Sequence, residues 1–192
     1  MGPFMQAVLD MAVEALDMAV HRGGLDNPVG CPGAGRYRHL EAAVRAYFRR
    51  SGCLVTIEPH GSRGPDIEGP GIVGEIKSRR EVERDLRGYW SAWNSSARFG
   101  GKRCDFRLRD VLPEDVDMLP GAVRGWIATI YGQLRNYVHR AGLTEGWLVV
   151  EDGAGCAHDL RAAVRYLERH GLAHASALDY YQGLAFVEIA YR

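Results

Sequence analysis

Residues 65–78, PDIEGPGIVGEIKS, restrict the fold of this chain more than any other segment. β-Prone residues stand on both sides of a Gly-Pro-Gly turn, so the segment is predicted to form a β-hairpin. With the turn centred between Pro70 and Gly71, Asp66 lies directly opposite Glu75. Directly opposed side chains share one face of a sheet, with Cβ atoms about 4.5–5.5 Å apart. The hairpin is therefore expected to bring two carboxylates together.

The two faces of this hairpin differ in their chemistry. Lys77 follows Glu75 by two residues and shares its face, whereas Ile67 and Ile76 face the other way. Two opposed carboxylates repel each other unless a cation lies between them. Because carboxylate oxygens suit Mg²⁺ and Mn²⁺, the pattern predicts a divalent metal site at Asp66 and Glu75. The alternative is a solvated, charged face on a surface hairpin.

Lysine is rare in this chain. Of the 24 basic residues, 22 are arginines and only Lys77 and Lys102 are lysines. A compact ammonium suits a position beside a metal-bound water, where a planar guanidinium does not substitute for it. We therefore expect Lys77 to orient or deprotonate such a water and to offset charge that develops on a phosphoryl group.

A third acid is predicted on the helix that spans residues 36–50. Glu41 shares a face of this helix with Leu40, Val44 and Phe48. A carboxylate on the apolar side of a helix is costly unless it is paired, protonated or metal-bound. The position indicates either a further metal ligand or a solvated edge of the helix.

The hairpin contains two short motifs whose acids are nine residues apart, Pro65-Asp66 and Glu75-Ile76-Lys77. Their order and spacing resemble the motif of the PD-(D/E)XK nuclease superfamily, the restriction-endonuclease-like fold. The resemblance implies that Asp66 and Glu75 bind Mg²⁺, which Mn²⁺ can replace, together with the backbone carbonyl of Ile76. It also implies that Lys77 is the catalytic lysine and Glu41 an accessory metal ligand.

The resemblance implies an α/β (α+β) fold with a restriction-endonuclease-like core, a central mixed β-sheet flanked by helices in αβββαβ order. Besides the hairpin, the sequence pattern predicts helices at 36–50, 122–141 and 157–170 and strands at 53–59, 147–153 and 184–192. Residues 1–35 are predicted to form an N-terminal helix and a Gly/Pro-rich loop. Residues 36–192 are expected to form the nuclease-like domain, which an Arg/Trp-rich insertion interrupts at 79–121.

One more site residue is expected on the helix after the insertion. Gln133 and Tyr137 are four residues apart and therefore share a helix face, ahead of the apolar strand at 147–153. A Gln and a Tyr in this place are similar to those of several subfamilies of the same superfamily. We expect Gln133 to line the catalytic site, with an ordinary helix surface as the alternative.

The zero net charge hides two basic segments, residues 36–63 with a net charge of +4 and residues 79–109 with +5. Clustered arginines contact phosphates, so DNA is the expected partner, with RNA left open. The residues expected to bind nucleic acid are Arg79, Arg80, Arg84, Arg87, Trp90, Lys102 and Arg103. Aromatic residues among arginines stack on bases; in the alternative, they form a small core within the insertion.

The composition, 46% hydrophobic and 25% charged, is that of a globular domain and excludes a disordered chain. The four cysteines show no CxxC spacing, so we expect free thiols and a cytoplasmic location. No run of apolar residues comes near the length of about 20 residues that a membrane-spanning helix needs. The apolar helix expected at 4–21 packs on its own domain or supplies a homodimer contact.

These observations predict a Mg²⁺-dependent endonuclease of the restriction, resolvase or phage-defence type, which hydrolyses DNA phosphodiester bonds with metal-activated water. The alternative is a catalytically inactive module of the same fold that binds nucleic acid or a protein partner. An unrelated α/β enzyme finds no support, because the sequence lacks a Gly-rich phosphate loop, a G-x-S-x-G motif and an H-E-x-x-H motif.

Overall fold

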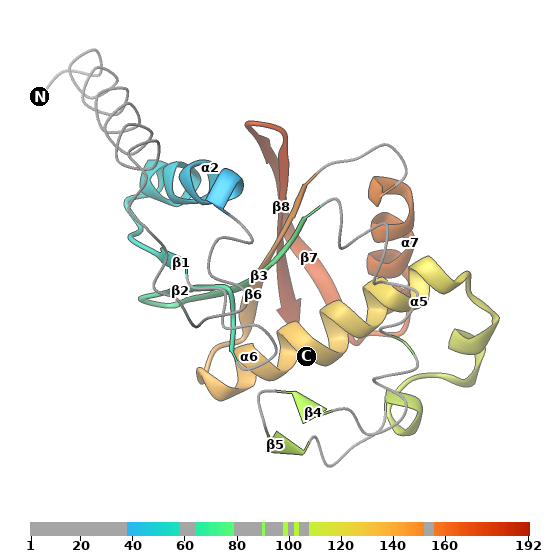
Figure 1. Cartoon of the computed structure of the whole chain (residues 1–192). Coiled ribbons are helices and arrows are strands. Elements are labelled where there is room, and N and C mark those ends of the chain that lie inside the picture. Colours follow the sequence, from blue (N-terminus) through green and yellow to red (C-terminus); the bar gives the residue numbers. More distant parts are fainter. Residues whose placement is uncertain are drawn as a thin grey trace, which may run out of the picture.

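The computed structural model describes residues 38–57, 64–78, 90, 98–99, 102–103, 108–151 and 156–192 (Figure 1). The predicted N-terminal helix, the Gly/Pro-rich loop and most of the insertion lie outside the described residues, as do four of the expected nucleic-acid ligands, Arg79, Arg80, Arg84 and Arg87. None of the described helices is long and apolar enough to cross a bilayer.

Six strands form one sheet in the order β1-β2-β3-β6-β8-β7. Their bounds are Thr56–Ile57 (β1), Ile67–Gly69 (β2), Ile72–Lys77 (β3), Glu145–Glu151 (β6), Ala173–Tyr181 (β7) and Leu184–Tyr191 (β8). β3 and β6 run parallel, and all other neighbours in this sheet are antiparallel. The sheet is therefore mixed, and the predicted α+β class is confirmed.

Helices cover both faces of the sheet. α2 (Arg38–Arg50) lies on one face, and the other face carries α7 (Cys156–Arg169) and a long helix made of three consecutive parts. These parts are α5 (Gly121–Ile127), the π-helical η4 (Ala128–Leu134) and α6 (Arg135–Arg140). The remaining described elements are two 3₁₀ turns, η2 (Leu108–Asp110) and η3 (Glu114–Met118), and a small sheet of β4 (Arg98–Phe99) and β5 (Lys102–Arg103).

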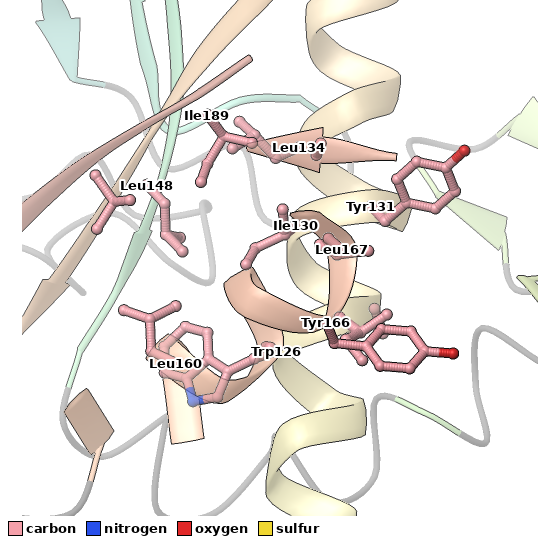
Figure 2. Close-up of a cluster of buried hydrophobic side chains, with 14 of the residues drawn as sticks. Trp126, Ile130, Tyr131, Leu134, Leu148, Leu160, Tyr166, Leu167 and Ile189 are labelled. Carbon is pink, nitrogen blue, oxygen red and sulfur yellow. The ribbon is translucent and has the colours of Figure 1, made fainter. Parts of the chain in front are cut away.

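Successive side chains of β3 point to opposite faces of the sheet, and each face has its own apolar core cluster. Ile76 packs with Val44 and Phe48 of α2 on one face of the sheet. Val73 faces the long helix and belongs to the cluster around Trp126. Figure 2 shows this second cluster, in which side chains of the long helix, α7 and the sheet meet. The polar residues of β3 that alternate with Ile72 and Ile76 consequently point towards the long helix.

The long helix lies very close to the sheet at Gly146 of β6. A Cβ atom added there would lie 2.5 Å from Val138 Cγ2 and 3.1 Å from Leu134 Cδ1. We expect Gly146→Ala to lower the free energy of unfolding by about 1–3 kcal/mol, because packed side chains must move. Urea unfolding measures the change. Gly121→Ala is the control, since an added Cβ meets no atom within 4 Å there; equal losses in both variants would contradict the tight approach.

The prediction from the sequence missed β7, the strand at one edge of the sheet. Its residues, AHASALDYY, are rich in alanine, which is uncommon in strands. Several of its side chains are exposed, and the pairing with β8 shifts between Ala175 and Ala177, so the strand shows no regular apolar alternation. The other predicted helices and strands within the described residues are present, with ends that move by a few residues.

Candidate active site

The hairpin has the predicted register, but its ladder ends one residue before the expected pair of carboxylates. β2 and β3 pair from Gly69↔Ile72 to Ile67↔Gly74. Gly71 adopts φ 73°, as the Gly of a type II Pro-Gly turn requires. The central position of the turn is thus confirmed, together with the placing of Ile67 and Ile76 in the core facing α2.

Asp66 is not a regular cross-strand partner of Glu75, which corrects the predicted pairing. Its backbone N–H donates a hydrogen bond to the carbonyl of Gly74 at 3.0 Å. Its carboxylate atom Oδ2 accepts a hydrogen bond from the backbone N–H of Ile76, also at 3.0 Å. Pro65 has no backbone N–H and therefore cannot donate a further hydrogen bond to the ladder. An aspartate side chain readily accepts a hydrogen bond from a backbone N–H in place of a backbone carbonyl. The side chain of Asp66 is thereby fixed against the edge of β3.

Glu75, Lys77 and Gln133 form a buried polar network on the sheet face that the long helix covers. Lys77 Nζ donates to Glu75 Oε1 at 2.6 Å, and Gln133 Nε2 donates to the same oxygen at 2.6 Å. Lys77 Nζ also lies 3.4 Å from Gln133 Oε1. All three residues are at most 3% exposed, and so is Asp66. Gln133, which was expected to line the catalytic site, thus contacts both Glu75 and Lys77.

The π-helical part of the long helix carries Gln133. A π turn changes the direction of the following side chains and is frequent at functional sites. Tyr191 at the end of β8 donates from its hydroxyl to the carbonyl of Ile130 at 2.8 Å, so a side chain satisfies one carbonyl within this part. The sheet itself therefore helps to hold the helix segment that delivers Gln133.

Tyr137 lies one turn after Gln133 and is nearly fully buried. Gln133 Nε2 donates to its hydroxyl oxygen at 3.3 Å. Burial raises the pKa of the Tyr137 hydroxyl, and the negative charge of Glu75 raises that pKa further, with a smaller contribution from Asp66. Both carboxylates thus lie close enough to act on one phenol, which stays protonated near neutral pH.

The oxygen atoms of this cluster fit a divalent cation of the Mg²⁺ type. Among the described residues of this cluster, Asp66 and Glu75 carry two negative charges and Lys77 carries one positive charge. Mg²⁺ is usually held by one or two carboxylates, with waters and substrate phosphates as its other ligands. Two buried carboxylates near the backbone of Ile76 provide such a set. The chemistry of the donors therefore agrees with the metal expected from the sequence.

Glu41 is not brought into this cluster. It is half-buried on α2, a helix whose apolar residues pack on the face of Ile67 and Ile76, whereas Glu75 faces the long helix. Within the part of the chain that the structure describes, no three or more Asp, Glu, His or Cys side chains are grouped so that they could hold a metal. Among the described residues, the two carboxylates of the candidate site are therefore those of Asp66 and Glu75.

Trp90, expected to stack on bases, is only 6% exposed and belongs to the core cluster under the long helix. The Arg124 guanidinium lies 5.7 Å from the centre of its ring. Trp90 is therefore a core residue, but of the main core cluster rather than of the small separate core that was the alternative. Lys102 and Arg103 stand on β5, and the contacts of their side chains lie outside the described part of the chain.

A surface groove of about 380 Å³ lies beside Pro65, the chain neighbour of Asp66, and Tyr137, and was not predicted from the sequence. Its walls include Gly64, Pro65, Glu68, Val73, Tyr137 and Arg140. Arg140 follows Tyr137 by three residues, and its guanidinium lies 5.3 Å from the centre of the Tyr137 ring. Helical spacing from Gln133 and Tyr137 was the signal that could have identified Arg140 as a residue near the site.

We compared the chain with protein-family models, with curated proteins and with solved structures, and none of the three comparisons gives a match. The function is therefore inferred from the geometry of Asp66, Glu75, Lys77 and Gln133.

Proposed function

We propose that the protein is a Mg²⁺-dependent nuclease that hydrolyses phosphodiester bonds of DNA, with the restriction-endonuclease-like core expected from its motif. The observation that carries the proposal is the buried network in which Glu75 Oε1 accepts hydrogen bonds from both Lys77 and Gln133. Asp66, equally buried, lies at the same end of the hairpin.

The energetic cost of this network supports a functional role. Taking a carboxylate and an ammonium out of water costs several kcal/mol per ion, and well-packed apolar residues are often as stable or more stable in such a place. Here Lys77 is 1% exposed and Glu75 3% exposed. A chain that needed only a stable hairpin would not require two acids, a lysine and a glutamine there. Buried, hydrogen-bonded charges of this kind are frequent at catalytic sites.

Each residue has a role that follows from its contacts. Asp66, Glu75 and the carbonyl of Ile76 would hold Mg²⁺, which when bound polarises a phosphoryl oxygen and lowers the pKa of a coordinated water. Lys77 is held by Glu75 and Gln133 and presents its ammonium at the same place. It orients the attacking water and offsets the negative charge that develops on the phosphoryl oxygens. Gln133 positions Glu75 and Lys77 relative to each other.

The charge distribution supports nucleic acid as the substrate. The basic segments 36–63 and 79–109 lie on both sides of the hairpin in the sequence, although the whole chain is neutral. Arginines in such segments contact phosphates without regard to base sequence. DNA is the substrate proposed, and an assay with RNA under the same conditions distinguishes the two.

The test is incubation of the protein with supercoiled DNA, linear duplex, single-stranded DNA and RNA, each with Mg²⁺, Mn²⁺ or EDTA. We expect nicking or linearisation of the supercoiled DNA with either metal, and none with EDTA, because hydrolysis requires the metal-activated water. Salt-sensitive DNA binding without cleavage under any condition would contradict the nuclease and favour a non-catalytic nucleic-acid-binding module.

A further inference from the structure

A surface groove lies beside residues that neighbour or contact the proposed site. One wall contains Pro65, the chain neighbour of Asp66. Another contains Tyr137, which accepts a hydrogen bond from Gln133, and Gln133 in turn donates to Glu75. The groove is therefore linked to the buried carboxylates through Pro65 and Tyr137, while Asp66 and Glu75 themselves are not among its described lining residues.

Two opposite charges stand in the walls of this groove. Arg140 and Glu68 are both exposed and both line it. Neither takes part in an ion pair with another described residue. The Arg140 guanidinium lies 5.3 Å from the Tyr137 ring centre, a cation–π contact that restricts its motion while its N–H donors stay in contact with water. Arg140 is thus held next to the site with hydrogen-bond donors available to an anion.

From this arrangement we infer that the groove binds one nucleotide of the cleaved strand, next to the bond that is hydrolysed, with its phosphate on Arg140. The inference deepens the proposed nuclease function and rests on it. A guanidinium matches the geometry of phosphate oxygens and is the side chain preferred for them. The groove has the size of a small-ligand site, about 300–1,000 Å³ in general, so it holds part of one strand rather than a duplex.

Because Glu68 and Arg140 carry opposite charges, neutralising each of them should change the affinity for nucleic acid in opposite directions. The carboxylate of Glu68 repels a phosphate in the groove, whereas Arg140 attracts it. Binding is measured in the Asp66→Asn background, which is expected not to cleave. We expect Arg140→Gln to weaken binding about two- to fivefold, as for exposed charge pairs, and to reduce the salt slope by about 0.7–0.9. Glu68→Gln should strengthen binding by about the same factor.

Two matched variants on other elements serve as controls. Arg169→Gln on α7 and Glu114→Gln on η3 remove the same charges from exposed positions outside the groove. α7 packs beside β7, whereas α6, which carries Arg140, packs beside β3 and β6. We expect neither control to change affinity or slope as the groove variants do. Thermal unfolding of all variants checks that the fold is kept.

The phosphate that Arg140 contacts can be located by replacing one phosphate of the strand at a time with a neutral linkage. Oligonucleotides that carry a single methylphosphonate at successive positions are bound to the protein with and without Arg140→Gln. At one position, next to the cut bond, the neutral linkage should weaken binding only when Arg140 is present, because the partner charge is otherwise already missing. Equal losses at every position in both proteins would overturn the assignment of Arg140 to a phosphate.

Different results would overturn the assignment of the groove as the strand site and the proposed nuclease activity. If the wild-type protein cleaves DNA but neither Arg140→Gln nor Glu68→Gln changes binding relative to its control, the groove is not the strand site and the nuclease proposal stands. If the wild-type protein neither cleaves nor binds nucleic acid with any metal, both are overturned.

Discussion

Asp66→Asn is expected to abolish cleavage and leave the fold intact. An asparagine carbonyl still accepts the hydrogen bond that Ile76 N–H donates to Asp66 Oδ2 at 3.0 Å, so the end of the hairpin keeps its geometry. The negative charge that would hold Mg²⁺ is lost. A bound metal contributes several kcal/mol to transition-state stabilisation, so cleavage should fall by at least about 100-fold. Nicking of supercoiled DNA in Mg²⁺ measures the loss.

Calorimetric titration with Mn²⁺ separates a metal ligand from a residue with another role. Asp66→Asn should bind Mn²⁺ far more weakly than the wild type, while its thermal unfolding stays close to that of the wild type. Metal affinity equal to that of the wild type would remove Asp66 from the metal site, whatever the effect on cleavage.

Glu75 differs from Asp66, a difference that the sequence pattern alone does not reveal. From the opposed carboxylates, the loss of either acid is expected to relieve repulsion and leave stability unchanged or higher. In the structure, however, Glu75 is the partner of the buried Lys77. Removing Glu75 breaks a buried ion pair, which costs about 3–5 kcal/mol in comparable cases. Asp66→Asn is therefore a cleaner test of metal binding than Glu75→Ala, because it leaves the ion pair of Lys77 with Glu75 in place.

Local sequence chemistry was enough to predict the hairpin. Pro70 and Gly71 define the turn, and the alternation of apolar residues fixes which face of each strand is buried. The residue at which the ladder ends could not be predicted in this way. Asp66 is not paired regularly with Glu75, because its side chain accepts a hydrogen bond from the backbone N–H of Ile76. This hydrogen bond depends on the geometry of the strand end rather than on spacing.

The place of Gln133 was predicted from helical spacing and a family motif, but its contacts depend on residues far away in the chain. Glu75 and Lys77, its hydrogen-bond partners, come from another element. The π-helical segment and its contact with Tyr191 have no clear signal in a single sequence. The same holds for Trp90: the sequence left base stacking and a small core within the insertion open, whereas the structure buries Trp90 in the main core cluster.

Lys77→Arg is the variant that separates water orientation from simple electrostatics. The ammonium is 1% exposed and lies 2.6 Å from Glu75 Oε1 and 3.4 Å from Gln133 Oε1. A guanidinium keeps the charge, but its planar shape and larger size do not fit the same contacts. We expect cleavage to fall about 10²–10³-fold, as for the loss of one positioned transition-state donor. Binding of uncleaved DNA in EDTA should be unchanged, because the net charge of the site is the same.

Lys77→Met provides the complementary change, since methionine has a similar length without the charge. If Lys77 acts on the attacking water and the phosphoryl oxygens, both variants should be nearly inactive, although only Lys77→Met alters the charge of the site. Single-turnover cleavage with saturating DNA measures the chemical step apart from binding, and urea unfolding reports the cost of overpacking in Lys77→Arg, about 1–3 kcal/mol. A Lys77→Arg protein that cleaves at the wild-type rate would show that position 77 needs only a positive charge, as in a general phosphate contact.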